Sequence, residues 1–314
     1  MTHLIEHMLF EGTTTRSAHE ISNAIESVGG EFNAATTQER TFYHINIPRK
    51  YFSRAVNIMA DIFKNSLFDE KVLKKEKNVV LNEIKVVDDD PKFYQWIALL
   101  RTIYKKHKAK NPVYGDADTI KKMSRKDIIT YYKKHYIPQN ISISIVGNIK
   151  NPFKLIKDKF EGIPSRTIQR DNHPEEKPLS QPQKKVIKRD VEHSYVVVGY
   201  RAVPKGHQDS YVFEVMRSIL GRGQSSRLFD EIRTKRGIAY MVGALYESGQ
   251  TFGVFATYLS TTQDKLKEAR KVLIESFQFK DLAKKEVEDA KNYIIGNFIL
   301  KREDNKERAD MNAE

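Results

Sequence analysis

Residues 3–10, His-Leu-Ile-Glu-His-Met-Leu-Phe, decide how the chain is interpreted. The spacing of their apolar residues predicts a helix that ends at Gly12, since glycine commonly follows a helix C-terminus. At about 100° per residue, the polar side chains and Phe10 share one arc of this helix, and the other four apolar side chains lie opposite. The polar arc holds His3, Glu6, His7 and Phe10, and the apolar arc holds Leu4, Ile5, Met8 and Leu9. The helix therefore buries one face and presents two imidazoles and a carboxylate on the other.

Two histidines that lie one helical turn apart can both bind a single zinc ion. A carboxylate beside them, Glu6, would lie next to the open position of the ion, where a base is needed to take a proton from water. The alternative is an ordinary amphipathic helix with two surface histidines. Catalytic zinc usually takes three protein ligands. Because the chain has no cysteine, the third ligand must be His, Asp or Glu.

A long helix expected over residues 69–87 offers two carboxylates, Glu76 and Glu83. Their separation of two turns puts both on one helix face, about 10.5 Å apart along the axis. They cannot easily both bind the ion directly, so one would bind zinc and the other would support a ligating histidine. Spacing alone does not decide between these roles, nor does it distinguish them from two solvated carboxylates.

The composition excludes several classes of protein. The chain has 314 residues, of which 39% are apolar, and a formal net charge of +13. Its length favours about two domains. No apolar run reaches the roughly 18 residues of a membrane-spanning helix, and the absence of cysteine excludes a disulfide scaffold, a thiolate nucleophile and a thiolate zinc site.

The positive charge leaves open a second class of partner. A basic surface attracts acidic partners and nucleic acid without sequence preference. The lysines are spread along the chain, however, and the densest cluster, residues 105–110, has no interleaved aromatic residues and is typical of a loop. A solvated Lys-rich surface is therefore the simpler interpretation.

Hydrophobic patterning predicts an α+β fold. Helices are expected around residues 3–10, 55–62, 69–87, 92–103, 124–135, 208–220, 226–236, 263–277 and 283–302. Strands are expected over 42–47, 141–147 and 185–201, with a hairpin over 239–259 that turns near 247–250. The predicted organisation is two related domains, residues 1–163 and 185–314, joined by a Pro-rich linker over 164–184. Each domain would be a mostly antiparallel sheet packed with helices.

The motifs together resemble the pitrilysin/insulysin family of inverzincins, especially the branch related to the mitochondrial processing peptidase. The first helix carries the inverted zinc motif of that family. The other matching blocks are residues 32–37 with Thr41 and Tyr43, residues 76–83, Gly115 with the helix over 124–136, residues 146–148, residues 221–229 and residues 233–240.

The resemblance implies a zinc endopeptidase that acts on peptides or unfolded segments, with one zinc ion per chain. It implies that His3, His7 and Glu83 bind zinc, that Glu6 is the general base and that Glu76 supports a ligand. Arg233 and Tyr240, from the other domain, would bind substrate near the scissile bond. Gly237 lies between these two residues and is expected to end a helix there, so that both face one region.

The resemblance also implies a homodimer or a related partner chain. The sequence shows no recognition-helix or RNA-binding motif, so no specific nucleic acid partner is expected. Only Met1 and Thr2 precede the zinc motif, and a polar run, residues 301–314, ends the chain. The family pattern places strands before the zinc motif and continues beyond the polar run, so the first domain is expected to be truncated at its start and the second at its end. No signal peptide is visible, and the expected location is cytoplasmic. The alternatives are a catalytically silent partner subunit of the same fold and, less favoured, a basic nucleic-acid-binding protein.

Overall fold

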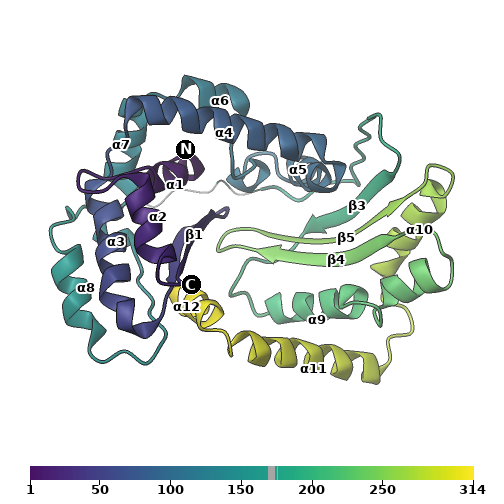
Figure 1. The fold of residues 1–314 in the computed structure, drawn as a ribbon. Coiled ribbons are helices and arrows are strands. Elements are labelled where there is room, and N and C mark those ends of the chain that lie inside the picture. Colours follow the sequence, from purple (N-terminus) through teal and green to yellow (C-terminus); the bar gives the residue numbers. More distant parts are fainter. Residues whose placement is uncertain (169–173, 175) are drawn as a thin grey trace. The chain divides into compact units, whose positions relative to one another are not determined.

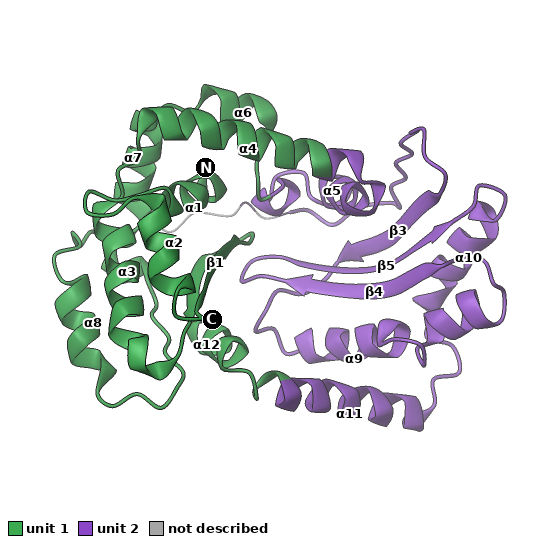
Figure 2. Cartoon of the chain, in the orientation of Figure 1, with its two compact units in different colours: residues 1–86, 113–171, 301–314 green, residues 87–112, 172–300 purple. Residues whose placement is uncertain are grey.

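The computed structural model describes residues 1–168, 174 and 176–314, and these form two compact units (Figure 2). Unit 1 comprises residues 1–86, 113–171 and 301–314, and unit 2 comprises residues 87–112 and 172–300. Both units combine helices with antiparallel strands, which confirms the predicted α+β class. Residues 87–112 cluster with the second unit and residues 301–314 with the first. The domain boundaries at 163 and 185 stay a prediction, and residues 169–173 and 175 of the predicted linker lie outside the described residues.

Unit 1 is mostly helical (Figure 1). Its helices are α1 (Thr2–Phe10), α2 (Ala18–Glu26), α3 (Phe52–Asn65), α4 (Glu70–Asp89), α6 (Ala117–Lys122), α7 (Arg125–His135), α8 (Pro152–Phe160) and α12 (Asn305–Ala313). Capping boxes at Ser17 and Ser124 begin α2 and α7, because each serine side chain satisfies a free backbone N–H of the first turn. The last residues of α4 belong to unit 2.

Among the described residues, the sheet of unit 1 is one hairpin. Strands β1 (Glu31–Thr36) and β2 (Thr41–Asn46) are antiparallel, and their last pair before the turn is Thr36 with Thr41. The Thr37 N–H donates to the Arg40 carbonyl over 2.7 Å and closes the turn. One face of the hairpin contacts the aromatic ring of Phe10, at the end of α1, through Phe32 and Tyr43.

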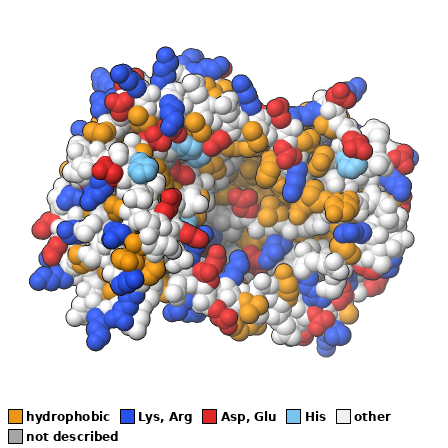
Figure 3. Space-filling model, viewed as in Figure 1, with side chains coloured by type: hydrophobic (Ala, Val, Ile, Leu, Met, Phe, Trp, Pro, Cys, Tyr) orange, Lys and Arg blue, Asp and Glu red, His pale blue; other side chains and the backbone are white. Residues whose placement is uncertain are grey.

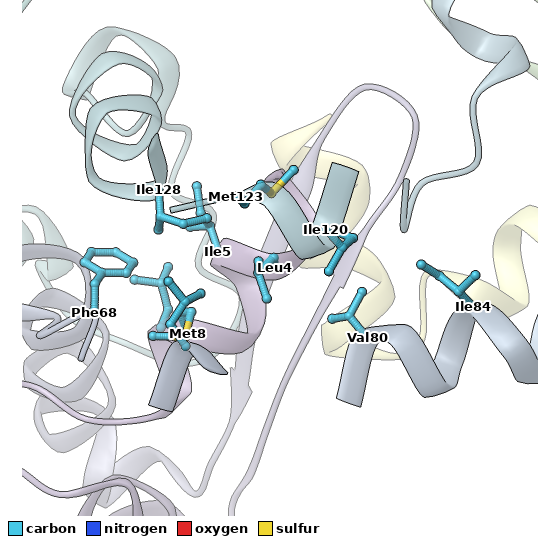
Figure 4. Close-up of a cluster of buried hydrophobic side chains, with 11 residues drawn as sticks. Leu4, Ile5, Met8, Phe68, Val80, Ile84, Ile120, Met123 and Ile128 are labelled. Carbon is cyan, nitrogen blue, oxygen red and sulfur yellow. The ribbon is translucent and has the colours of Figure 1, made fainter. Parts of the chain in front are cut away.

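The core of unit 1 holds α1 in place. Leu4, Ile5, Met8 and Leu9 are at most 1% exposed. They pack with Leu73, Val80 and Ile84 of α4 and with side chains from α6 and α7 (Figure 4). Burial of each such side chain is worth about 1.5–3 kcal/mol, so the apolar arc fixes the rotation of the helix. The arc that carries His3, Glu6 and His7 is thereby turned toward the other side.

Unit 2 is built on a three-stranded antiparallel sheet. The strands are β3 (Ser194–Arg201), β4 (Met241–Ser248) and β5 (Gly253–Thr261), in the order β3-β5-β4. The helices are α5 (Pro91–Ile103), α9 (Ser210–Gly221), α10 (Leu266–Ser276) and α11 (Lys284–Lys301). Alternate residues of β5 serve the two sheet faces: Phe255 packs with α9 and α10, and Ala256 packs with α5.

Three sequence predictions need correction. Residues 141–147 do not form a strand: Ile143 is 46% exposed, and none of the described residues pairs with this segment. Alternation alone makes a strand only where a neighbour supplies ladder hydrogen bonds. The strand expected over 185–201 begins only at Ser194, because its partner Thr261 is the last residue of β5. The helix expected over 226–236 is shorter, covering 227–234, and its turn Phe229–Thr234 is π-helical.

The polar run at 301–314 contains α12, whose first turn is capped by Asp304. Arg40 forms an ion pair with Asp310 of this helix, with Nη1 and Oδ1 2.9 Å apart. No helix in the described part of the chain is both long enough and apolar enough to cross a membrane.

Candidate metal centre

Helices α1 and α4 bring His3, His7 and Glu83 together. The Nε2 atom of each histidine lies 3.6 Å from a carboxylate oxygen of Glu83. One nitrogen or oxygen from each of the three residues lies within 4.8 Å of the other two. These separations are longer than hydrogen bonds, and two imidazoles with one carboxylate are a donor set that suits zinc. The three residues therefore fit a metal site.

The two imidazole rings meet edge to face, with centroids 4.8 Å apart and an angle of 77° between their planes. Burial, followed by the neighbouring His7, lowers the pKa of His3 to about 4. His3 is therefore neutral at neutral pH, which is the form that binds a metal. Its Nδ1 atom is buried and has no hydrogen-bond partner among the described residues.

Glu76 and Glu83 contact different sides of His7. The Nδ1 atom of His7 is 3.1 Å from Oε2 of Glu76, and Nε2 faces Glu83. A proton on Nδ1 satisfies Glu76 and leaves the Nε2 lone pair free on the side of Glu83. Glu76 is itself buried, and its other oxygen lies 3.4 Å from the Lys75 ammonium, which also reaches Glu11. Because Glu76 and Glu83 lie two turns apart along α4, each reaches a different nitrogen of His7.

Glu6 extends from the same arc of α1 and is 9% exposed. Its Oε2 atom accepts a hydrogen bond from the Thr36 hydroxyl of β1. Burial raises the pKa of Glu6 above its usual value, against the hydrogen bond from Thr36 and the influence of His7, which lower it. A carboxylate with a raised pKa next to a candidate metal site is suited to accept and return a proton.

Arg233 and Tyr240 lie side by side in unit 2. The Arg233 guanidinium carbon is 5.1 Å from the centroid of the Tyr240 ring and 4.9 Å from that of Phe229. Gly237, with φ of +59°, reverses the chain between them, and its N–H donates to the Arg233 carbonyl. Tyr240 is 80% exposed, so its hydroxyl is available to a ligand. That this pair acts at the same site as the histidines stays a prediction.

Sequence reasoning assigned no role to Thr36 or Lys75. Thr36 lies in the block of residues 32–37, but nothing local in the sequence indicates that β1 delivers its hydroxyl to Glu6. Lys75 looks like one more of the several lysines of α4. In Figure 3, Lys and Arg side chains are dispersed over the visible faces of both units and mixed with Asp and Glu, so charge density does not single it out.

Two family models together match most of the chain. The model described as insulinase (peptidase family M16) matches residues 1–117, and that described as peptidase M16 inactive domain matches residues 122–294. Among curated relatives, the uncharacterized zinc protease YmxG of Bacillus subtilis is 31% identical over the whole of this chain and 77% of its own length. An uncharacterized zinc protease of Mycobacterium leprae is 30% identical, over 96% of this chain and 69% of its own length.

Solved structures share the fold. A protease from Helicobacter pylori superposes with a TM-score of 0.85 at 22% identity, over 99% of this chain and 77% of that one. A peptidase M16 inactive domain from Pseudomonas fluorescens has a TM-score of 0.83 at 20% identity, over 93% of this chain and 73% of that one. At these identities the likeness concerns architecture, and the assignment to a family depends on the sequence matches.

Proposed function

Because the chain belongs to peptidase family M16, the insulinase family, we propose that it is a zinc-dependent endopeptidase that hydrolyses peptides or unfolded polypeptide segments. The observation that carries the proposal is the convergence of His3, His7 and Glu83, with one donor atom from each within 4.8 Å of the others. Its relatives are named zinc proteases, and a donor set of two histidines and one glutamate supports the same metal here.

His3, His7 and Glu83 would hold one zinc ion per chain. When bound, zinc supplies the positive charge that makes water a stronger acid and polarises the peptide carbonyl. Glu6 accepts the proton of the attacking water and passes it to the leaving amine, so that its carboxylate is restored at the end of the cycle. Glu76 keeps the His7 proton on Nδ1 and thereby orients the ring.

Arg233 and Tyr240 would bind substrate near the scissile bond. The guanidinium charge and the exposed phenol hydroxyl are both donors, and peptide carbonyl oxygens are their natural acceptors. We also propose that the active form is a homodimer or a complex with a related chain.

A catalytically silent partner subunit of the same fold would be expected to have lost residues of the site. The family model described as an inactive domain matches residues 122–294. His3, Glu6, His7 and Glu83 all lie outside that range, within residues 1–117. That match therefore does not favour a silent subunit.

The test measures zinc per chain and cleavage of an unfolded polypeptide, denatured casein, by the full chain. We expect about one zinc per chain after dialysis without chelator. We expect Glu6→Gln to keep this zinc and to lose at least about 100-fold in turnover, since a general base contributes roughly 10²–10⁴-fold. The matched control is Glu26→Gln, the same change at an exposed glutamate of α2. Folded protein without zinc, or undiminished turnover by Glu6→Gln, would contradict the proposal.

A further inference from the structure

We infer that Thr36 is the positioning residue for Glu6: its hydroxyl holds the Oε2 oxygen of the carboxylate and leaves Oε1 to exchange the proton with water and the leaving amine. This inference rests on the proposed peptidase function and extends it to a residue outside the metal-binding helices. The observation behind it is the hydrogen bond between Thr36 Oγ1 and Glu6 Oε2, across 30 positions of sequence. No hydrogen bond from any described residue reaches Oε1.

The hydroxyl of Thr36 has a second contact, with the hydroxyl of Thr41 on β2, at 3.1 Å. A threonine hydroxyl carries one proton and two lone pairs, and an ionised carboxylate only accepts. Thr36 therefore donates its proton to Glu6, and its oxygen accepts the proton of Thr41. The hydroxyl protons of Thr41 and Thr36 therefore both point toward Glu6. The hydroxyls of Tyr43 and Tyr136 form a separate pair, 3.2 Å apart.

The backbone that carries the hydrogen-bonded threonines, Thr36 and Thr41, is rigid. Thr36 and Thr41 are directly paired in the hairpin, next to a turn closed by Thr37 and Arg40. Threonine is β-branched, so few χ1 rotamers compete with the observed one. Tyr43 and Tyr136 pack against the apolar core under α1, so the hairpin is fixed relative to the helix that carries Glu6.

A glutamate has several rotatable bonds, and one hydrogen bond to a charged group is enough to select among its conformers. Misplacing a reacting group by an ångström is costly in rate. Loss of the Thr36 hydroxyl is therefore expected to lower kcat without removing the metal ligands or the substrate-binding groups.

The test compares Thr36→Val, which keeps the shape of the side chain and removes the hydroxyl, with Thr36→Ser, which keeps the hydroxyl. We expect Thr36→Val to lower kcat roughly 10- to 100-fold, with KM within about twofold and zinc per chain unchanged. Thr36→Ser restores kcat to within about threefold of the wild type. The control is Thr130→Val, the same change at an exposed position of α7, where the hydroxyl donates to the Lys126 carbonyl. It is expected to affect thermal stability only.

Crystal structures of the two variants give a readout that does not depend on turnover. In Thr36→Val we expect the Glu6 carboxylate in another conformer or in several, and in Thr36→Ser the single wild-type conformer. Where Thr36→Val does not fold, Thr41→Val takes its place: it leaves the Thr36 hydroxyl but removes the proton behind it, with an expected loss of about two- to fivefold in kcat.

Wild-type kcat in Thr36→Val, or equal loss in Thr36→Ser, would overturn the inference, as would an unmoved Glu6 in the Thr36→Val crystal. Failure of the proposed function gives a different pattern. In that case the wild type itself lacks zinc or activity, or Glu6→Gln is as active as the wild type. An active wild type, an inactive Glu6→Gln and a fully active Thr36→Val would reject the role of Thr36 alone.

Discussion

His7 is the residue where two acidic side chains of one helix acquire different surroundings. Glu76 is buried and accepts from Nδ1, and Glu83 is 42% exposed in its side chain and faces Nε2 of both histidines. A carboxylate that accepts the second N–H of a ligating histidine fixes the tautomer and the ring orientation. The geometry thus separates two roles that helical spacing leaves interchangeable.

This separation predicts the outcome of Glu76→Gln. The amide keeps the size of the side chain but loses the charge that holds the proton on Nδ1, so zinc affinity is expected to fall roughly 10- to 100-fold. The zinc affinity is measured by competition with a chromogenic chelator at fixed pH. Glu70→Gln, at an exposed position in the first turn of the same helix, serves as the control and is expected to bind zinc as the wild type does. An unchanged affinity in Glu76→Gln would remove Glu76 from the site.

At the scale of elements, an ion pair joins Arg227, just before the π-helical turn, to Glu286 at the start of α11. Arg227 contacts both carboxylate oxygens of Glu286, at 2.5 and 2.7 Å, and also donates to the carbonyls of Lys280 and Asp281. Asp281 has a φ of +50°, in the left-handed region. The arginine therefore secures the loop before α11 through two carbonyls and one carboxylate.

The Arg227–Glu286 ion pair should make the stability of unit 2 depend on pH in the acid range. The Arg227 guanidinium, through its hydrogen bonds, lowers the pKa of Glu286 to about 2 from an ordinary value of 4.5. A folded-state pKa below the unfolded value stabilises the fold above pH 4.5, and the contribution is lost as pH falls from about 4.5 to about 2.

The measurement is the urea midpoint of the wild type and of Glu286→Gln across that pH range. We expect the wild type to be more stable at pH 7 and the two to converge at the acid end. The control is Glu288→Gln, an exposed carboxylate two residues further along α11. A difference between wild type and Glu286→Gln that does not change with pH would show that the charge of Glu286 contributes nothing.

For the whole molecule, zinc should stabilise unit 1 and leave unit 2 unchanged. All three candidate ligands belong to unit 1. A ligand that binds only the folded state stabilises it by about 2.7 kcal/mol at 100 times its Kd, or roughly 5–10 °C in melting temperature for a unit of this size. Calorimetry with and without zinc should show one transition that moves and one that does not. His7→Ala should abolish the shift, and a shift that persists in His7→Ala would place the zinc elsewhere.

Much of this arrangement follows from local sequence. The apolar arc of residues 3–10 predicts both the helix and the face that it buries, because Leu4, Ile5, Met8 and Leu9 recur at helical spacing. The same spacing puts His3, Glu6 and His7 on the opposite arc. The helices over 69–87, 92–103 and 124–135 and the hairpin over 239–259 were also predictable, since periodicity and turn residues are local properties.

Other features depend on contacts between distant residues. The segment over residues 141–147 has the alternation of a strand but no described partner, and β3 begins at Ser194 only because β5 ends opposite it. A strand needs a hydrogen-bonded partner, so the sequence of one segment alone cannot show whether it forms a strand or where that strand begins.

The candidate metal site divides in the same way. The amino-acid sequence by itself determines which residue types can bind zinc and which helix faces carry them, because helical geometry relates residues three, four or seven apart. Only the tertiary structure decided that Glu83 faces both Nε2 atoms, that Glu76 contacts Nδ1 and that Thr36 contacts Glu6. These contacts depend on the packing of α4 and of the β1–β2 hairpin against α1, and that packing results from burial of apolar side chains far apart in the chain.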